Sequence, residues 1–78
     1  MIFVVAICRD RQPRSFRVQI RPGYSQAPMA TSRACASASA ARREAERVFG
    51  PLAWTDPAAH GVLQDYVIQV ARCQSDVA

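Results

Sequence analysis

The stretch that decides the fold is residues 2–21, IFVVAICRDRQPRSFRVQIR. Its first part, residues 2–8, is apolar throughout and has no polar positions at helical spacing, which is typical of a strand buried on both faces. Residues 16–21 then alternate apolar and polar side chains, the period-2 pattern of a second strand. The turn between them is polar and contains a proline, so we predict an antiparallel hairpin that ends at Pro22-Gly23.

The composition indicates one small domain with a β-rich core. Half of the 78 residues are apolar, and the β-branched apolar residues Val and Ile greatly outnumber Leu, which favours strands over a helical bundle. A chain of this length has room for one core, and its composition argues against a membrane span or a disordered tail. We therefore expect a single domain over residues 1–78, with a frayed tail over 74–78.

Residues 31–49 permit two interpretations. In the first, the whole segment is one helix with its alanines near one face. In the second, residues 31–36 form a strand that pairs with 16–21, and Ser37 or Ser39 caps a helix that follows. The second interpretation is favoured because two serines stand where a cap is needed, but the sequence alone leaves both open.

The end of this helix is better defined than its start. Gly50 followed by Pro51 predicts a stop directly after Phe49. The predicted helix then has an apolar face opposite its charged residues, and that face consists of Ala41, Ala45, Val48 and Phe49.

The remaining chain is predicted to be a loop followed by the last strand. Residues 52–61 contain turn signals, with a short strand at 52–55, and residues 66–71 (YVIQVA) form the last strand. The predicted fold is α+β: an antiparallel four- to five-stranded sheet in β-β-β-α-β order, with one helix packed on one face.

The cysteines indicate a reducing compartment. Cys8, Cys35 and Cys73 are odd in number and form no CxxC pair, so we expect free thiols rather than a disulfide framework. The apolar start has no basic region before it, which argues against a signal peptide. We expect a cytoplasmic protein in the host cell cytosol. The three cysteines and His60 lack the paired spacing of a zinc site, so we expect no metal and no cofactor.

The positive charge is concentrated in the first hairpin. All ten basic residues are arginine, the formal net charge is +4, and residues 1–33 hold six of the arginines against a single acid, Asp10. Such a surface attracts phosphate backbones or an acidic protein surface, although ordinary solvated charges would give the same composition. The predicted partner-binding residues are Arg9, Arg11 and Arg14 at the hairpin tip and Arg17, Arg21 and Arg33 on the open sheet face.

One helix covers only one face of such a sheet. Because residues 2–8 are apolar toward both faces, we expect a partner or a second copy of the chain to cover the other face. The alternative is a central strand that is shielded by the long arginine stems of its neighbours.

No pattern in the chain indicates catalysis. The sequence has no P-loop, no GxSxG, no HExxH and no dinucleotide fingerprint. His60, the single histidine, is expected to be an ordinary loop residue, and Glu44 and Glu46 diverge on the predicted helix. We expect no enzymatic activity.

Residues 35–45, CASASAARREA, resemble the strand-to-helix junction of many small phage and mobile-element proteins, among them anti-CRISPR proteins that inhibit type I CRISPR effector complexes. The predicted topology is also similar to that of this group. The resemblance implies a binding module without catalysis that docks on the RNA-guided surveillance complex and blocks target DNA recognition. It carries over no individual binding residue.

We therefore expect a non-enzymatic binding protein from a phage or mobile element, an anti-CRISPR inhibitor in its most specific form. Its expected partner is a CRISPR effector complex, nucleic acid held by the first hairpin, or both, and no membrane. Two alternatives stay open. One is a small basic nucleic-acid-binding module, and the other is a homodimeric accessory or structural protein.

Overall fold

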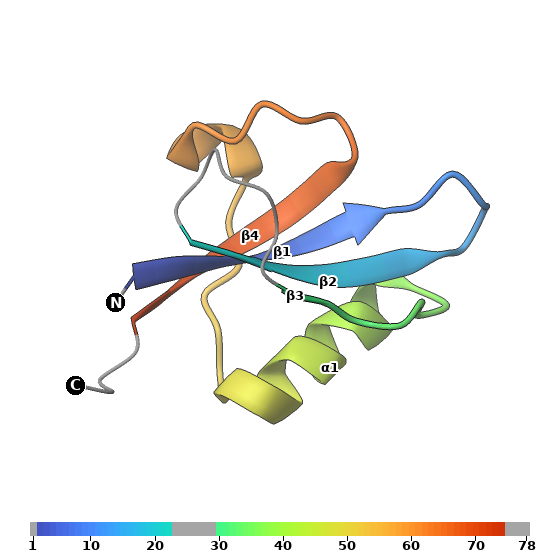
Figure 1. Cartoon of the computed structure of the whole chain (residues 1–78), viewed down its shortest axis with the longest axis horizontal. Helices are drawn as coiled ribbons and strands as arrows, with labels where there is room; N and C mark the ends of the chain where they lie inside the picture. The colour runs from blue at the N-terminus through green and yellow to red at the C-terminus, as the bar shows by residue number, and fades with distance from the viewer. Residues whose placement is uncertain (1, 23–29, 75–78) are drawn as a thin grey trace.

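The computed structural model describes residues 2–22 and 30–74 and has one helix packed on an antiparallel sheet (Figure 1). The sheet order is β3-β2-β1-β4, so the first strand lies in the interior of the sheet. The predicted α+β fold is confirmed. The elements are β1 (Ile2–Arg9), β2 (Phe16–Arg21), β3 (Ala30–Thr31), α1 (Ala38–Phe49), the 3₁₀ turn η1 (Pro57–His60) and β4 (Val67–Gln74).

The central strand β1 pairs along most of its length on both sides. With β2 it forms the predicted hairpin, in which Ile7 lies opposite Val18 and Arg9 opposite Phe16. On its other edge it pairs with β4, with a bulge between Ile7 and Cys8. The last strand begins one residue later than predicted and continues further, through Gln74. Of the predicted frayed tail, residues 75–78 lie outside the described residues.

The strand predicted over residues 31–36 forms only in part, as β3 (Ala30–Thr31) and one bridge further on, and the helix follows as the strand-then-helix interpretation predicts. Thr31 pairs with Gln19 in β2, and Cys35 forms an isolated bridge with Phe16. Between these two points the ladder is interrupted, and the side chain of Ser32 takes the place of a backbone acceptor. Its Oγ accepts a hydrogen bond from the Val18 amide at 3.0 Å.

The helix begins after one of the two serines that the sequence offered as a cap, and it ends at the predicted glycine. Ser37 is the N-cap, and its Oγ accepts a hydrogen bond from the Ala40 amide at 3.1 Å. At the other end Gly50 has a φ of 79° and a ψ of −169°, a backbone conformation that is essentially confined to glycine. Its amide donates to the carbonyl of Glu46 at 2.8 Å. The helix therefore has the length that its two punctuating residues dictate.

The helix packs on the sheet through its smallest side chains. Ala41 and Ala45 are fully buried against Val5, Ile7 and Val18. Alanine at these two positions allows the helix backbone to lie close to the sheet.

Around this contact, Phe49 packs on Phe3 with ring centroids 5.4 Å apart. Val48, predicted to face inward, is 59% exposed, so that expectation is wrong. Its position one residue before Phe49 turns it to the flank of the helix rather than toward the sheet.

The opposite face of the sheet is covered by the chain itself. Val4, Ala6 and Cys8 point away from the helix. They are buried with Val67, the first residue of β4, and with Val62, from the segment that contains η1 and leads into β4 (Figure 1). The expectation that this face is open is therefore wrong, and the apolar residues of β1 need no partner or second copy to bury them. Sequence periodicity places side chains on a face but does not show whether a loop folds back over it.

Arg21 attaches this covering segment to the sheet. The segment, which contains η1 and leads into β4, is the second cover, and the helix is the first. Its residue surface is 2% exposed, and its guanidinium donates to the side-chain oxygens of Gln19, Gln64 and Tyr66. It also lies 5.9 Å from the centroid of the Tyr66 ring, within the range of a cation–π contact. Gln64 and Tyr66 belong to the covering segment, so the guanidinium joins it to β2. The expected exposure of Arg21 on an open face is therefore wrong.

We predict that Arg21→Ala lowers the free energy of unfolding by about 2 kcal/mol, because it leaves a void and removes the hydrogen bonds that hold the cover. The matched control is Leu63→Ala in the same segment, where the side chain is 84% exposed. We expect the control to change stability by less than about 0.5 kcal/mol. Urea unfolding of the three proteins measures both effects, and equal values for the two variants would contradict the proposed attachment.

Candidate functional site: an arginine hairpin

The loop between β1 and β2 is held in one conformation by Asp10. The Asp10 amide donates to the carbonyl of Ser15 at 2.9 Å, and its carboxylate accepts hydrogen bonds from Ser15 Oγ at 2.9 Å and Arg17 Nε at 2.7 Å. At the far side of the loop Arg14 lies in the left-handed region, with a φ of 59°. The single acid of this hairpin thus closes the loop and faces back toward Arg17.

Hydrogen bonds to the Asp10 carboxylate lower its pKa. The hydrogen bond from Arg17, followed by that from Ser15, holds the pKa of the Asp10 carboxyl below its ordinary value. The carboxylate therefore stays charged at neutral pH and neutralises Arg17 locally. Arg17 is further engaged, because its Nη1 donates to the Ser32 carbonyl at 3.1 Å.

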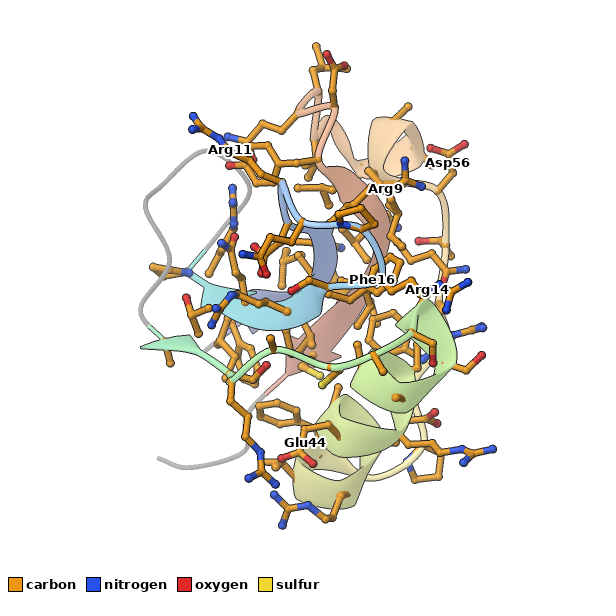
Figure 2. All side chains as sticks on the ribbon, turned by 90° about the vertical axis from the view of Figure 1, so that its right-hand side faces the viewer. Arg9, Arg11, Arg14, Phe16, Glu44 and Asp56 are labelled. Carbon is orange, nitrogen blue, oxygen red and sulfur yellow. The ribbon has the colours of Figure 1, made fainter. Side chains whose placement is uncertain are left out.

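Three of the six predicted contact residues lie at the hairpin tip. Arg9, Arg11 and Arg14 are all exposed, and within residues 2–22 and 30–74 none of them forms an ion pair. Figure 2 views the molecule from the hairpin end and shows Arg11 and Arg14 on opposite sides of it. The tip therefore presents positive charge in more than one direction.

The other three predicted residues do not join this cluster. Arg17 is half-buried and paired with Asp10, and Arg21 is buried under the second cover. Arg33 is exposed, but it lies on the chain between β3 and α1. There it adds to the hydrogen bond from Arg47 in lowering the pKa of Glu44. The predicted six-residue surface is thus a three-residue tip with three arginines placed elsewhere.

A second group of arginines lies on the helix and was not predicted as part of a site. Arg43 and Arg47 are exposed, and Arg47 forms an ion pair of 2.7 Å with Glu44 one turn earlier. The bridge between Phe16 and Cys35 places the start of α1 beside the hairpin, as Figure 1 shows. The signal in the sequence was the run ARREAER, which we interpreted only as the solvated face of the helix.

A hollow of the described surface lies apart from the hairpin. It is an open groove of about 620 Å³ between η1 and β4, with Asp56 and Asp65 in its lining and no arginine among the residues that form it. His60 lies near this groove and bonds to Thr55 Oγ1 at 2.8 Å. Within residues 2–22 and 30–74, no three side chains of His, Cys, Asp or Glu are grouped to hold a metal ion.

The three cysteines are free thiols in different environments. Cys8 is buried beneath the second cover, whereas Cys35 and Cys73 are partly exposed. Burial raises the pKa of Cys8 to about 11, against a smaller opposing effect of the Arg21 charge. Cys8 is therefore a protonated core residue at neutral pH.

Comparisons with known proteins give no relative from which to transfer a site. No protein-family model, curated protein or solved structure matches the chain. None of the helices that the structure describes has the length and apolar character to cross a membrane. The site is therefore interpreted from its own residues.

We predict that the stabilising effect of Asp10 disappears in acid. Because the Asp10 pKa is lowered in the folded protein, its contribution is present above the unfolded pKa of about 4 and is lost as the pH falls through the folded value. Wild type should be more stable than Asp10→Asn at pH 7, and the difference should shrink below about pH 4. Urea midpoints measured across this range test the prediction, which a pH-independent difference would contradict.

We predict that Cys8 resists alkylation in the native protein. At neutral pH, iodoacetamide should modify Cys35 and Cys73 but leave Cys8 unmodified, since its thiol is buried and its pKa is raised. In urea all three should react. Mass spectrometry of the digested protein measures each site, and labelling of native Cys8 as fast as Cys73 would contradict the buried position.

Proposed function

We propose that this protein is a non-enzymatic binding module that holds a polyanionic partner through the tip of its β1–β2 hairpin. The observation that carries the proposal is the arrangement of Arg9, Arg11 and Arg14, exposed and without ion pairs among the described residues, on a loop that Asp10 closes. A fixed loop loses little conformational entropy when it binds, so its arginines are ready for charge-assisted hydrogen bonds to phosphate or carboxylate.

The distribution of charge supports the tip over the rest of the surface. The acid of the hairpin is engaged by Arg17. On the helix, where Arg43 and Arg47 are exposed, Glu44 lies among the arginines and pairs with Arg47. The tip is thus the place where arginine charge is least compensated by nearby carboxylates. Polyanions are attracted to such a place, with an affinity that depends on salt.

The more specific form of the proposal is an anti-CRISPR inhibitor from a phage or mobile element. In the host cytosol it binds a type I CRISPR effector complex and blocks recognition of target DNA. The support for this form is the resemblance of residues 35–45. The recurring residues of that motif, Ser37, Ala41 and Ala45, cap the helix and pack it on the sheet. The contact with the complex is therefore assigned to the hairpin tip and not to the motif.

The general proposal predicts that binding depends on where the arginines lie and not on net charge alone. Arg11→Glu with Arg14→Glu should abolish binding of the protein to heparin and to a DNA duplex. Arg43→Glu with Arg47→Glu changes the net charge equally and should leave most of the affinity. Fluorescence anisotropy titrations at about 50 and about 200 mM salt measure both variants; three phosphate contacts imply a loss of roughly 40-fold for wild type over this range. Equal losses from the two double variants would overturn the proposal.

The specific form needs its own experiment. A purified type I effector complex is mixed with the protein, and its binding to target DNA is measured by gel shift. The inhibitor proposal predicts that wild type prevents DNA binding and that the hairpin double variant does not. If the complex binds DNA normally at saturating protein, the anti-CRISPR form is rejected.

A further inference from the structure

We propose that the polyanion is B-form DNA, and that the loop between β1 and β2 enters the major groove with Arg11 and Arg14 directed at the phosphates of its two walls. This inference rests on the proposed function, because it names the ligand of the same hairpin.

The shape of the hairpin fits this groove. The major groove is about 12 Å wide and about 8.5 Å deep, and it admits a two-stranded β-ribbon. Strands in a sheet lie about 4.8 Å apart, which leaves space on each side for a side chain. The loop of residues 10–15 extends beyond the last pair of the hairpin, Arg9 and Phe16. At about 3.3 Å per residue, three residues on each arm reach at most roughly 10 Å, comparable with the depth of the groove.

The neighbouring elements leave this loop accessible. On one side β4 ends its contact with the hairpin where the Tyr66 carbonyl accepts from the Arg9 amide. On the other side the bridge from Cys35 reaches Phe16, the first residue of β2. Figure 1 shows the loop at one extreme end of the molecule, so a ligand meets it before it meets the body of the sheet.

The chemistry of the tip favours nucleic acid over an acidic protein. Residues 11–14 are Arg-Gln-Pro-Arg and all four are exposed, so the tip contains no aromatic or large aliphatic side chain. Protein interfaces are typically centred on such an anchor, which fills a desolvated pocket of the partner. Protein–DNA interfaces are instead more polar and much more positively charged.

The position of the charges also matches a groove. Arg11 and Arg14 lie on opposite sides of the hairpin (Figure 2), so that each can reach one of the two phosphate strands that border the groove. Asp10 would repel phosphate, but its carboxylate is held back by Ser15 and Arg17. Gln12 lies between the two arginines in the sequence and is the uncharged amide nearest the apex. Because the contacts are mainly to phosphate, binding is expected to depend little on sequence.

The test compares ligands of similar charge with different shape. The full chain is titrated against a DNA duplex, the corresponding single strand, an RNA duplex of the same sequence, heparin and poly-glutamate. The inference predicts the tightest binding to duplex DNA, displacement by methyl green in the major groove, and no displacement by netropsin in the minor groove.

Single substitutions locate the phosphate contacts. Arg11→Gln and Arg14→Gln should each reduce the slope of log affinity against log salt by about 0.9, the contribution of one phosphate contact. The loss of affinity between about 50 and about 200 mM salt should then be roughly 3- to 4-fold smaller than for wild type. Arg43→Gln, an exposed helix arginine, is the matched control and should leave the slope unchanged.

The outcomes separate this inference from the function on which it rests. Binding to heparin or poly-glutamate as tight as to duplex DNA, with loss in the hairpin variants, overturns the DNA ligand and retains the polyanion-binding tip. Displacement by netropsin but not by methyl green overturns the major groove. If wild type binds none of these polyanions at low salt, both the inference and the polyanion function fail.

Discussion

The structure depends on burying both faces of the central strand β1. Five consecutive residues, Val4 to Cys8, are each 3% exposed or less. Side chains alternate between the two faces of a strand, so a run of this kind requires two separate covers. The chain supplies both, with α1 on one side and the segment around η1 on the other. Most of the described chain is used to build the sheet and these two covers, and the proposed binding residues lie on a loop outside them.

The two covers are attached by different physical means. The helix uses close packing, in which the small side chains of Ala41 and Ala45 allow many contacts with the sheet. The second cover offers fewer apolar side chains and is held by the buried guanidinium of Arg21. A buried cation is costly unless its donors are satisfied. Gln19, Gln64 and Tyr66 satisfy them with neutral oxygens, so no carboxylate among the described residues is needed at this position.

Sequence reasoning identified the elements whose signals are local. The apolar run of β1, the alternation of β2 and the Gly50 stop each depend on a few adjacent residues, and each was found in the expected place. The helix cap, Ser37, is one of the two serines that the sequence offered. The second cover could not be predicted in this way. Its buried residue Val62 is isolated in a segment without periodicity, and its burial depends on contacts with Val4, Ala6 and Cys8, in a strand more than forty residues away.

Local sequence patterns do not show which distant segments come into contact, and this also explains which site residues were predicted correctly. Alternation correctly places Arg21 on the face of the sheet opposite the helix. It contains no information on whether that opposite face is exposed to solvent. Arg33 was assigned to the sheet because strand pairing was expected to continue through it. The ladder is interrupted there by Ser32, and Arg33 instead lies where its charge acts on Glu44. The three arginines of the tip were predictable because a turn between two strands is exposed by construction.

One residue type thus has three different roles in the first hairpin, and the surroundings of each arginine decide which. Arg21 is enclosed by neutral acceptors and acts as part of the core. Arg17 meets a carboxylate and closes the loop. Arg11 and Arg14 meet neither a cover nor an acid among the described residues, so their charge is directed at solvent and at any anion that approaches. These roles depend on the buried central strand. Because both faces of β1 are buried, the hairpin is fixed in place, and its arginines keep a constant arrangement.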